Sequence, residues 1–256
     1  MFNFFAENDA RQGDYFYISG SDYNHIRNVL RMKQGEEFLV SCDGISSLCR
    51  LDSFEGDSFE GDSAVAEIIE ENYQSTDLPI KIYLFQGLPK SDKMEFIIQK
   101  AVELGVHAII PTQMQRCVVK LDDKKKKSKT QRWQTIAESA AKQSKRSAVP
   151  TVYDAVSYGE ALNMAKDLDV LMVPYECKNG MFSTRIALNQ IKEGTKVGII
   201  IGPEGGFEES EVEKAIAIGG ESISLGKRIL RTETAAITAV GMVMLHCEMN
   251  LGGDKE

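Results

Sequence analysis

The spacing of hydrophobic residues changes along the chain. Over residues 1–72, short runs of alternating apolar and polar residues are separated by Gly and Asp, which predicts strands at 15–18, 37–41, 45–51 and 64–69 and a helix at 21–29. From residue 80 onward, β-branched runs alternate with helical spacings. We therefore predict a small β domain over 1–72, a linker over 73–79, and an α/β domain with a mainly parallel sheet over 80–256.

The last helix of the α/β domain differs from the others in its apolar pattern. Strand-like runs occupy 80–85, 108–111, 170–174, 199–201 and 222–225. Helical spacing follows Ser91, a candidate N-cap, as far as Gly105, and it recurs over 133–144. Thr232 or Thr234 is a candidate N-cap of the last helix, which is apolar on nearly all sides. Such a helix lies in a core or in a subunit interface, so the pattern predicts a homodimer.

A glycine-rich loop follows the strand at 199–201. Gly202 and Pro203 turn the chain, and open α/β sheets bind ligands at the carboxyl ends of their strands. Carboxylates such as Glu204 and Glu208 crowd the start of the next helix, which favours a cationic or neutral ligand over a pyrophosphate. Neither the phosphate-loop motif nor the dinucleotide glycine spacing is present. A tight, well-capped turn without a ligand is the alternative.

A second glycine loop follows the run at 222–225. Gly226 turns the chain, and Arg228 and Arg231 stand just before the last helix. Two glycine loops that each follow a strand indicate one shared ligand site. The two arginines then either act on the substrate or are only solvent-exposed residues of the turn.

Both loops carry motifs of a known family. Gly-Pro-Glu-Gly-Gly at 202–206 and Leu-Gly-Lys-Arg-Ile-Leu-Arg-Thr-Glu-Thr-Ala at 225–235 resemble the signature of the RsmE family of SPOUT methyltransferases, which modify uridine N3 in 16S ribosomal RNA. The similarity continues upstream through Gln-Gly-Leu-Pro-Lys at 86–90 and Val-Leu-Arg at 29–31, and so covers almost the whole chain. Lys142 departs from the family pattern, which has an acidic residue at this position.

The resemblance implies a fold, a cofactor and a set of contacts. The N-terminal segment would be a PUA-like RNA-binding β-barrel, and the C-terminal domain would be a SPOUT domain with a trefoil knot. The cofactor would be S-adenosylmethionine, whose sulfonium cation suits the carboxylates of the first loop. The implied cofactor-binding residues are Pro174, Glu176, Ile201, Gly202, Pro203, Glu204, Gly206, Leu225, Gly226, Ile229, Leu230, Thr234 and Ala235.

The implied reaction is methylation of uridine N3, which carries an acidic imide proton. We hypothesise that Arg231, together with Arg116, stabilises negative charge on the uracil oxygens, and that Glu233 or solvent takes the proton. Contacts with RNA are expected at His25, Arg27, Arg31, Lys90, Lys93, Lys142 and Arg146. The alternative for His25 is a structural role at a helix–barrel junction, with its hydrogen bonds made within the protein.

The net charge of −8 is distributed unevenly. Residues 1–79 carry a net charge of −11, residues 80–150 carry +9, and residues 151–256 carry −6. The basic middle segment contains the lysine run 124–127, and Trp133 is a candidate for base stacking. A solvated loop is the alternative for the lysine run, but the nearby arginines and Trp133 favour contact with RNA.

Several function classes are excluded by what the sequence lacks. The five cysteines and three histidines have no metal-ligand spacing, so no metal site is predicted. No apolar run reaches the length of a membrane span, and the first residues do not resemble a signal peptide, so a cytoplasmic protein is expected. The expected partner is 16S ribosomal RNA within the small ribosomal subunit. The alternatives are a noncatalytic RNA-binding protein, a SPOUT methyltransferase acting on another RNA, and a nucleotide-dependent α/β enzyme.

Overall fold

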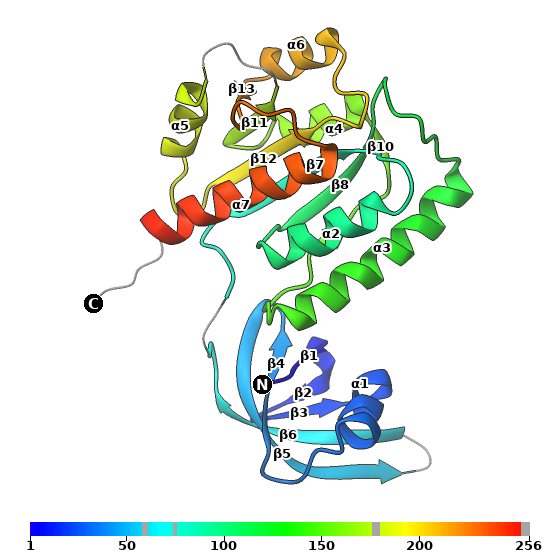
Figure 1. Cartoon of the computed structure of the whole chain (residues 1–256). Helices are drawn as coiled ribbons and strands as arrows, with labels where there is room; N and C mark the ends of the chain where they lie inside the picture. The colour runs from blue at the N-terminus through cyan, green and yellow to red at the C-terminus, as the bar shows by residue number, and fades with distance from the viewer. Residues whose placement is uncertain (58–60, 74–75, 176–179, 252–256) are drawn as a thin grey trace. The chain divides into compact units, whose positions relative to one another are not determined.

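The computed structural model divides the chain into two units (Figure 1). It describes residues 1–57, 61–73, 76–175 and 180–251, with the side chains of residues 57 and 123 left out. The N-terminal unit consists of Met1–Asp77 and Ala141–Val149, and the C-terminal unit consists of Leu78–Ala140 and Pro150–Glu256. The N-terminal unit is therefore built from two separate stretches of chain. The bounds expected for the domains and the linker stay a prediction.

The N-terminal unit contains a six-stranded sheet in the order β1-β4-β5-β6-β3-β2. β1 pairs with β4 in parallel and the other neighbours are antiparallel. Alternating residues of these strands, among them Phe4, Phe16 and Phe38, fill one core together with Ile26. The elements are β1 (Asn3–Ala6), a 3-10 turn (Asn8–Ala10), β2 (Arg11–Gln12), β3 (Tyr15–Ile18), α1 (Gly20–Asn24), a π-helical turn (His25–Val29), β4 (Glu37–Cys42), β5 (Ile45–Asp57) and β6 (Gly61–Glu70).

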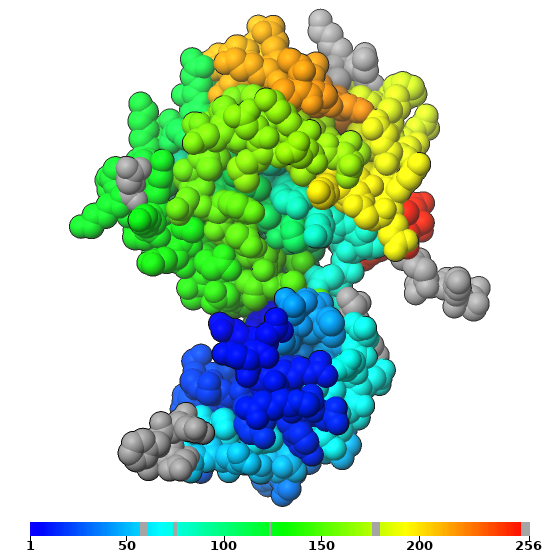
Figure 2. Space-filling model, turned by 180° about the vertical axis from the view of Figure 1, so that it is seen from behind, coloured from blue at the N-terminus to red at the C-terminus, as the bar shows by residue number. Residues whose placement is uncertain are grey.

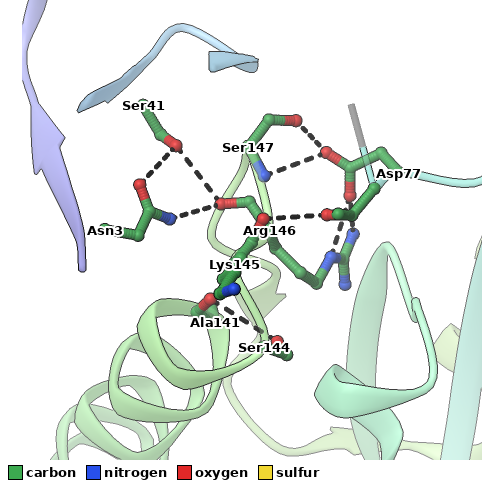
Figure 3. A network of polar contacts seen from close by, with 9 residues as sticks. Asn3, Ser41, Asp77, Ala141, Ser144, Lys145, Arg146 and Ser147 are labelled. Carbon is green, nitrogen blue, oxygen red and sulfur yellow. Dashed lines mark hydrogen bonds and ion pairs between the residues drawn. The ribbon is translucent and has the colours of Figure 1, made fainter. Parts of the chain in front are cut away.

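A polar network attaches Ala141–Val149 to the rest of this unit (Figure 3). Nε and Nη2 of Arg146 lie 2.8 and 2.7 Å from Oδ1 of Asp77, and the backbone N–H of Ser147 donates to Oδ2 of the same carboxylate. The carbonyl oxygen of Arg146 accepts a hydrogen bond of 3.0 Å from the side-chain amide of Asn3. The Arg146 side chain is only 8% exposed, so its charge is held inside the unit by its carboxylate partner.

The C-terminal unit contains a parallel sheet in the order β10-β8-β7-β12-β11-β13, with β9 paired to β8. This confirms the predicted α/β class with a mainly parallel sheet. Its strands are β7 (Lys81–Gly87), β8 (Ala108–Gln113), β9 (Thr151–Val152), β10 (Val156–Ser157), β11 (Val170–Pro174), β12 (Lys196–Ile201) and β13 (Glu221–Ile223). Its helices are α2 (Lys93–Glu103), α3 (Asp123–Gln143), α4 (Tyr158–Ala165), α5 (Phe182–Asn189), α6 (Glu209–Ala217) and α7 (Thr232–Asn250).

Helices cover both faces of this sheet. α7 packs against α2, β7 and β12 on the face seen in Figure 1. From behind, orange α6 lies at the surface above the lime-green region that contains α4 (Figure 2), and the hydroxyl of Tyr158 in α4 donates to the carbonyl oxygen of Glu211 in α6 at 2.7 Å. No helix in the described part of the chain is long and apolar enough to cross a membrane. The trefoil knot stays a prediction.

Three local expectations were wrong. The helix expected over 133–144 begins ten residues earlier, at Asp123, and so includes the lysine run 124–127, because lysine favours helix and the carboxylate of Asp122 accepts the N–H of Lys125 at 2.9 Å. Helix α2 has Asp92, not Ser91, at its N-cap. Helix α7 has Arg231 at its N-cap, because the hydroxyl of Thr232 is bonded elsewhere.

Candidate functional site

The candidate site lies at the carboxyl ends of three neighbouring strands. β7, β12 and β11 are adjacent and parallel, so Gly87, Ile201 and Pro174 end at the same edge of the sheet. Loops at this edge expose backbone N–H and C=O groups to a ligand. Pro174, Ile201, Gly202 and Pro203 of the expected cofactor-binding set are placed here, whereas Glu176 lies outside the described residues.

Close backbone approach explains the glycines of this edge. A Cβ on Gly87 would lie 2.6 Å from the backbone nitrogen of Pro203, and one on Gly202 would lie 3.2 Å from the ring of Phe207. Gly206 has a φ of +71°, a backbone conformation that residues other than glycine rarely adopt. The end of β7 and the loop after β12 are therefore in backbone contact.

The second glycine loop, 224–231, is anchored at one end and exposed at the other. Ser224 exchanges two hydrogen bonds with the side chain of Thr184, at 2.7 and 3.0 Å. Leu225, Gly226 and Leu230 are partly buried, whereas Ile229 is 93% exposed. The loop is therefore fixed at Ser224 and open to water at Ile229.

Arg231 leads directly from this loop into α7. Its side chain is exposed and has no hydrogen bond or ion pair within the described residues. Thr234 is exposed and Ala235 partly buried in the first turn of the helix. Arg231 thus presents a free guanidinium group at the site edge.

A buried chain of hydrogen bonds connects three segments of this edge. The side-chain amide of Gln86, at the end of β7, donates to the hydroxyl of Thr232 at 2.9 Å. That hydroxyl donates to the carbonyl oxygen of Gly202 at 2.7 Å. Gln86 is fully buried and Thr232 is 5% exposed. The sequence reasoning missed this role for both residues; the available signal was a glutamine at the end of an otherwise apolar strand.

A charged bridge connects the loop after β12 with the start of α7. Nζ of Lys93 lies 3.2 Å from Oε1 of Glu204 and 3.3 Å from Oε2 of Glu233. The hydrogen bond to Glu204 is the main cause of a raised pKa of Lys93. Burial alone would raise the pKa of Glu204, but the backbone N–H of Lys90 and the Lys93 ammonium outweigh it and leave this pKa below its usual range. Both groups therefore keep their charges at neutral pH.

Arg116 lies in the segment after β8 and contacts another part of the loop after β12. Its Nε donates to Oε1 of Glu208 at 2.7 Å and its Nη1 donates to the carbonyl oxygen of Gly205 at 3.1 Å. The hydrogen bond to Glu208 raises the pKa of Arg116 and lowers that of Glu208. The structure gives Arg116 and Arg231 separate neighbours, so their joint action on one uracil stays a prediction.

The expected RNA-binding residues differ in their exposure and in their contacts with the rest of the protein. His25 is exposed and lies edge-on to Phe4, and Arg31 is exposed with a φ of 54°. Arg27 lies over the rings of Tyr23 and Phe54, with its guanidinium carbon 5.6 and 5.1 Å from the ring centres. These three residues present cationic or aromatic groups at the surface of the N-terminal unit.

Three of the other four expected RNA-binding residues have protein partners. Lys142 forms an ion pair of 2.7 Å with Asp22, and Arg146 is buried against Asp77. Lys93 is paired as described above, whereas the side chain of Lys90 is exposed. Trp133 is 4% exposed, so the expectation that it stacks on a base was wrong; it sits on the buried side of α3. Within the described residues, no group of three His, Cys, Asp or Glu side chains is placed to hold a metal ion.

Known proteins match the chain over nearly its full length. A family model described as an RNA methyltransferase domain matches residues 76–244, and one described as an RNA methyltransferase PUA domain matches residues 18–50. The chain is 43% identical to ribosomal RNA small subunit methyltransferase E of Bacillus subtilis (strain 168), over 94% of this chain and 93% of that protein.

Solved structures agree with these matches. A ribosomal RNA small subunit methyltransferase E from Neisseria gonorrhoeae, solved bound to S-adenosyl methionine, is 32% identical with a TM-score of 0.76, over 96% of this chain and 97% of that chain. A crystal structure of a hypothetical protein reaches a TM-score of 0.86 at 40% identity, over 96% of this chain and 99% of that chain. On these grounds, the chain belongs to the ribosomal RNA small subunit methyltransferase E family of RNA methyltransferases.

Proposed function

We propose that this protein transfers a methyl group from S-adenosylmethionine to N3 of a uridine in 16S ribosomal RNA. One observation carries the proposal: Gln86, Thr232, Lys93 and two glutamates hold the loop after β12 against the start of α7, at the edge where a parallel sheet binds ligands. The family of the chain supports the same reaction.

The residues at this edge fit the proposed cofactor. The carboxylates of Glu204 and Glu233 outnumber the one ammonium group between them, which suits a cationic ligand. The buried Oε1 of Gln86 has no hydrogen-bond partner within the described residues. One hydrogen-bond acceptor at this edge is therefore unpaired. S-adenosylmethionine supplies an electrophilic methyl group when bound. The segments at 174–175, 201–206 and 225–235 would hold it.

The side chains at the start of α7 have the chemistry that the uridine requires. Removal of the N3 proton places negative charge on the uracil oxygens, and an exposed, unpaired guanidinium such as that of Arg231 stabilises this charge. The Glu233 carboxylate, whose Oε2 lies 3.3 Å from Nζ of Lys93, would accept the proton. Its Oε2 is buried and has no hydrogen bond, apart from its ion pair with Lys93.

The proposed partners are the small ribosomal subunit and a second copy of this chain, in the cytoplasm. α7 carries apolar side chains on its surface, with Leu245 52% and Met249 74% exposed. Covering these side chains in a dimer removes apolar area from water. Light scattering at micromolar concentration should give a dimer, and Leu245→Lys should shift it toward monomer; a monomeric wild type contradicts this part of the proposal.

The reaction is tested with methyl-labelled S-adenosylmethionine and small subunits from a strain that lacks the corresponding modification. After digestion of the RNA, label is expected in 3-methyluridine. Label in a different nucleoside would assign another reaction. Cofactor binding without labelling would assign another substrate, and absence of cofactor binding would favour a noncatalytic RNA-binding protein.

A further inference from the structure

Thr232 lies between the two residues proposed to act on the uridine. Arg231 precedes it and Glu233 follows it, yet the Thr232 side chain points into the protein and is 5% exposed. Its hydroxyl proton is donated to the carbonyl oxygen of Gly202, and its lone pair accepts from Nε2 of Gln86. The hydroxyl therefore connects the end of β7 and the loop after β12 to the first residue of α7.

The backbone of β7 sets the donor-to-acceptor direction of this chain of hydrogen bonds. Nε2 of Gln86 also donates to the carbonyl oxygen of Gly87 at 2.9 Å, so both N–H groups of the amide are used. A flipped amide would bring its oxygen against the Gly87 carbonyl, which places two acceptors face to face. The donors therefore run in one order, from Gln86 to Thr232 and from Thr232 to Gly202.

Fixing Thr232 also fixes its two neighbours. Successive helical residues are separated by about 100° around the axis, so an inward hydroxyl at 232 sends the flanking side chains to either side of it. The only other described link between this turn and the loop is the charged bridge through Lys93, whose side chain is 33% exposed to water. The buried link is the more rigid of the two, because water competes less well with buried hydrogen bonds.

We infer that Thr232, oriented by Gln86, is a positioning residue for methyl transfer: it aims Arg231 and Glu233 at the reacting uridine without touching it. This inference rests on the proposed function. A small error in the aim of a catalytic group lowers the rate of the chemical step far more than it lowers binding. Loss of the Thr232 hydroxyl is therefore expected to act on kcat.

The test compares Thr232→Val with Thr232→Ser in the full-length protein. Thr232→Val removes the hydroxyl and should lower kcat by about 100-fold, with the KM for small subunits and the calorimetric Kd for S-adenosylmethionine unchanged. Thr232→Ser keeps the hydroxyl and should restore kcat. Gln86→Met should resemble Thr232→Val. The double variant should be no worse than either single variant, because both substitutions break the same chain of hydrogen bonds.

Two further measurements keep the outcomes distinct. Thr151→Val, at an exposed threonine of β9 in the same unit, is the matched control and should be fully active. Faster amide exchange at Ala235, whose N–H donates to the carbonyl oxygen of Arg231 at 2.8 Å, should accompany Thr232→Val and report loosening of the first turn.

A fully active Thr232→Val overturns the inference, as does a Thr232→Ser that is no better than Thr232→Val. Equal losses in kcat and cofactor affinity would show a purely structural role and also overturn it. A wild-type protein that labels no uridine refutes the proposed function itself, and the inference with it.

Discussion

Nζ of Lys93 lies 3.3 Å from Oε2 of Glu233, the carboxylate proposed to accept the uridine proton. The same ammonium group lies 3.2 Å from Oε1 of Glu204. A lysine engaged by two carboxylates is poorly placed to bind an RNA phosphate as well. The contacts of Lys93 therefore favour a role in ordering the site over the RNA contact expected for it.

Replacing Lys93 by Met should lower kcat and leave RNA binding nearly intact. Without the ammonium group, the two carboxylates lose their shared partner and Glu233 loses its orientation. The measurement is subunit binding at several salt concentrations, together with turnover. A lost phosphate contact would instead reduce the salt slope by about 0.7–0.9. Lys81→Met, at an exposed lysine at the opposite end of β7, is the control for general loss of charge.

Arg231→Ala should reduce methyl transfer by about 100-fold or more while the Kd for S-adenosylmethionine stays constant. The guanidinium group is exposed and unpaired within the described residues, so its removal leaves no partner unsatisfied and the fold intact. Single-turnover labelling and calorimetry measure the two quantities. Arg228→Ala in the same loop is the control. Parallel losses in transfer and affinity would make Arg231 a cofactor ligand.

Gly87→Ala should destabilise the protein by about 1–3 kcal/mol and weaken cofactor binding. The added methyl group would lie 2.6 Å from the backbone nitrogen of Pro203, and backbone cannot move aside as a flexible side chain does. Urea unfolding and calorimetry provide the check. Gly159→Ala in α4 is the control, because a Cβ there meets no atom within 4 Å. Equal stabilities of the two variants would contradict the close approach.

Asp77→Ala should destabilise the N-terminal unit by about 3 kcal/mol, because it leaves the Arg146 guanidinium in a buried position without its carboxylate. Urea unfolding followed by circular dichroism measures the change. Arg50→Ala breaks an ion pair whose side chains are 45% and 43% exposed, and should cost about 0.5 kcal/mol or less. Similar effects of the two substitutions would refute the importance of the buried pair.

Buried thiols of the native protein should resist alkylation. Burial raises the pKa of Cys49 to about 12 and that of Cys247 to about 11, and it also raises the pKa of Cys42 and Cys117. At pH 7.5 the Cys49 thiolate is about 1000-fold scarcer than that of a free thiol. Iodoacetamide labelling followed by mass spectrometry should modify Cys49 and Cys247 only after addition of urea. Native labelling of Cys49 at the rate of glutathione would contradict its burial.

Local patterns were sufficient for most strands. β3 (Tyr15–Ile18) and β11 (Val170–Pro174) have the predicted bounds, because alternation and β-branched runs are properties of neighbouring residues. The start of α3 was missed by ten residues, since the lysine run has no apolar spacing and depends on helix propensity and on the Asp122 cap. Short elements such as β1 (Asn3–Ala6) were missed because their pairing partners lie far along the chain.

The sequence by itself determined the α/β class, the glycine loops at the strand ends, the surplus of carboxylates beside them and the family of the chain. These features depend on residue type and on short spacings, which folding does not alter. Only the tertiary structure decided which partners the polar side chains take. Thr232 bonds to Gly202 and to Gln86, which is 146 residues away, and Arg146 pairs with Asp77, 69 residues away. Periodicity carries no information over such separations, because these contacts arise when the packed core brings distant polar groups together and burial requires each to find a partner.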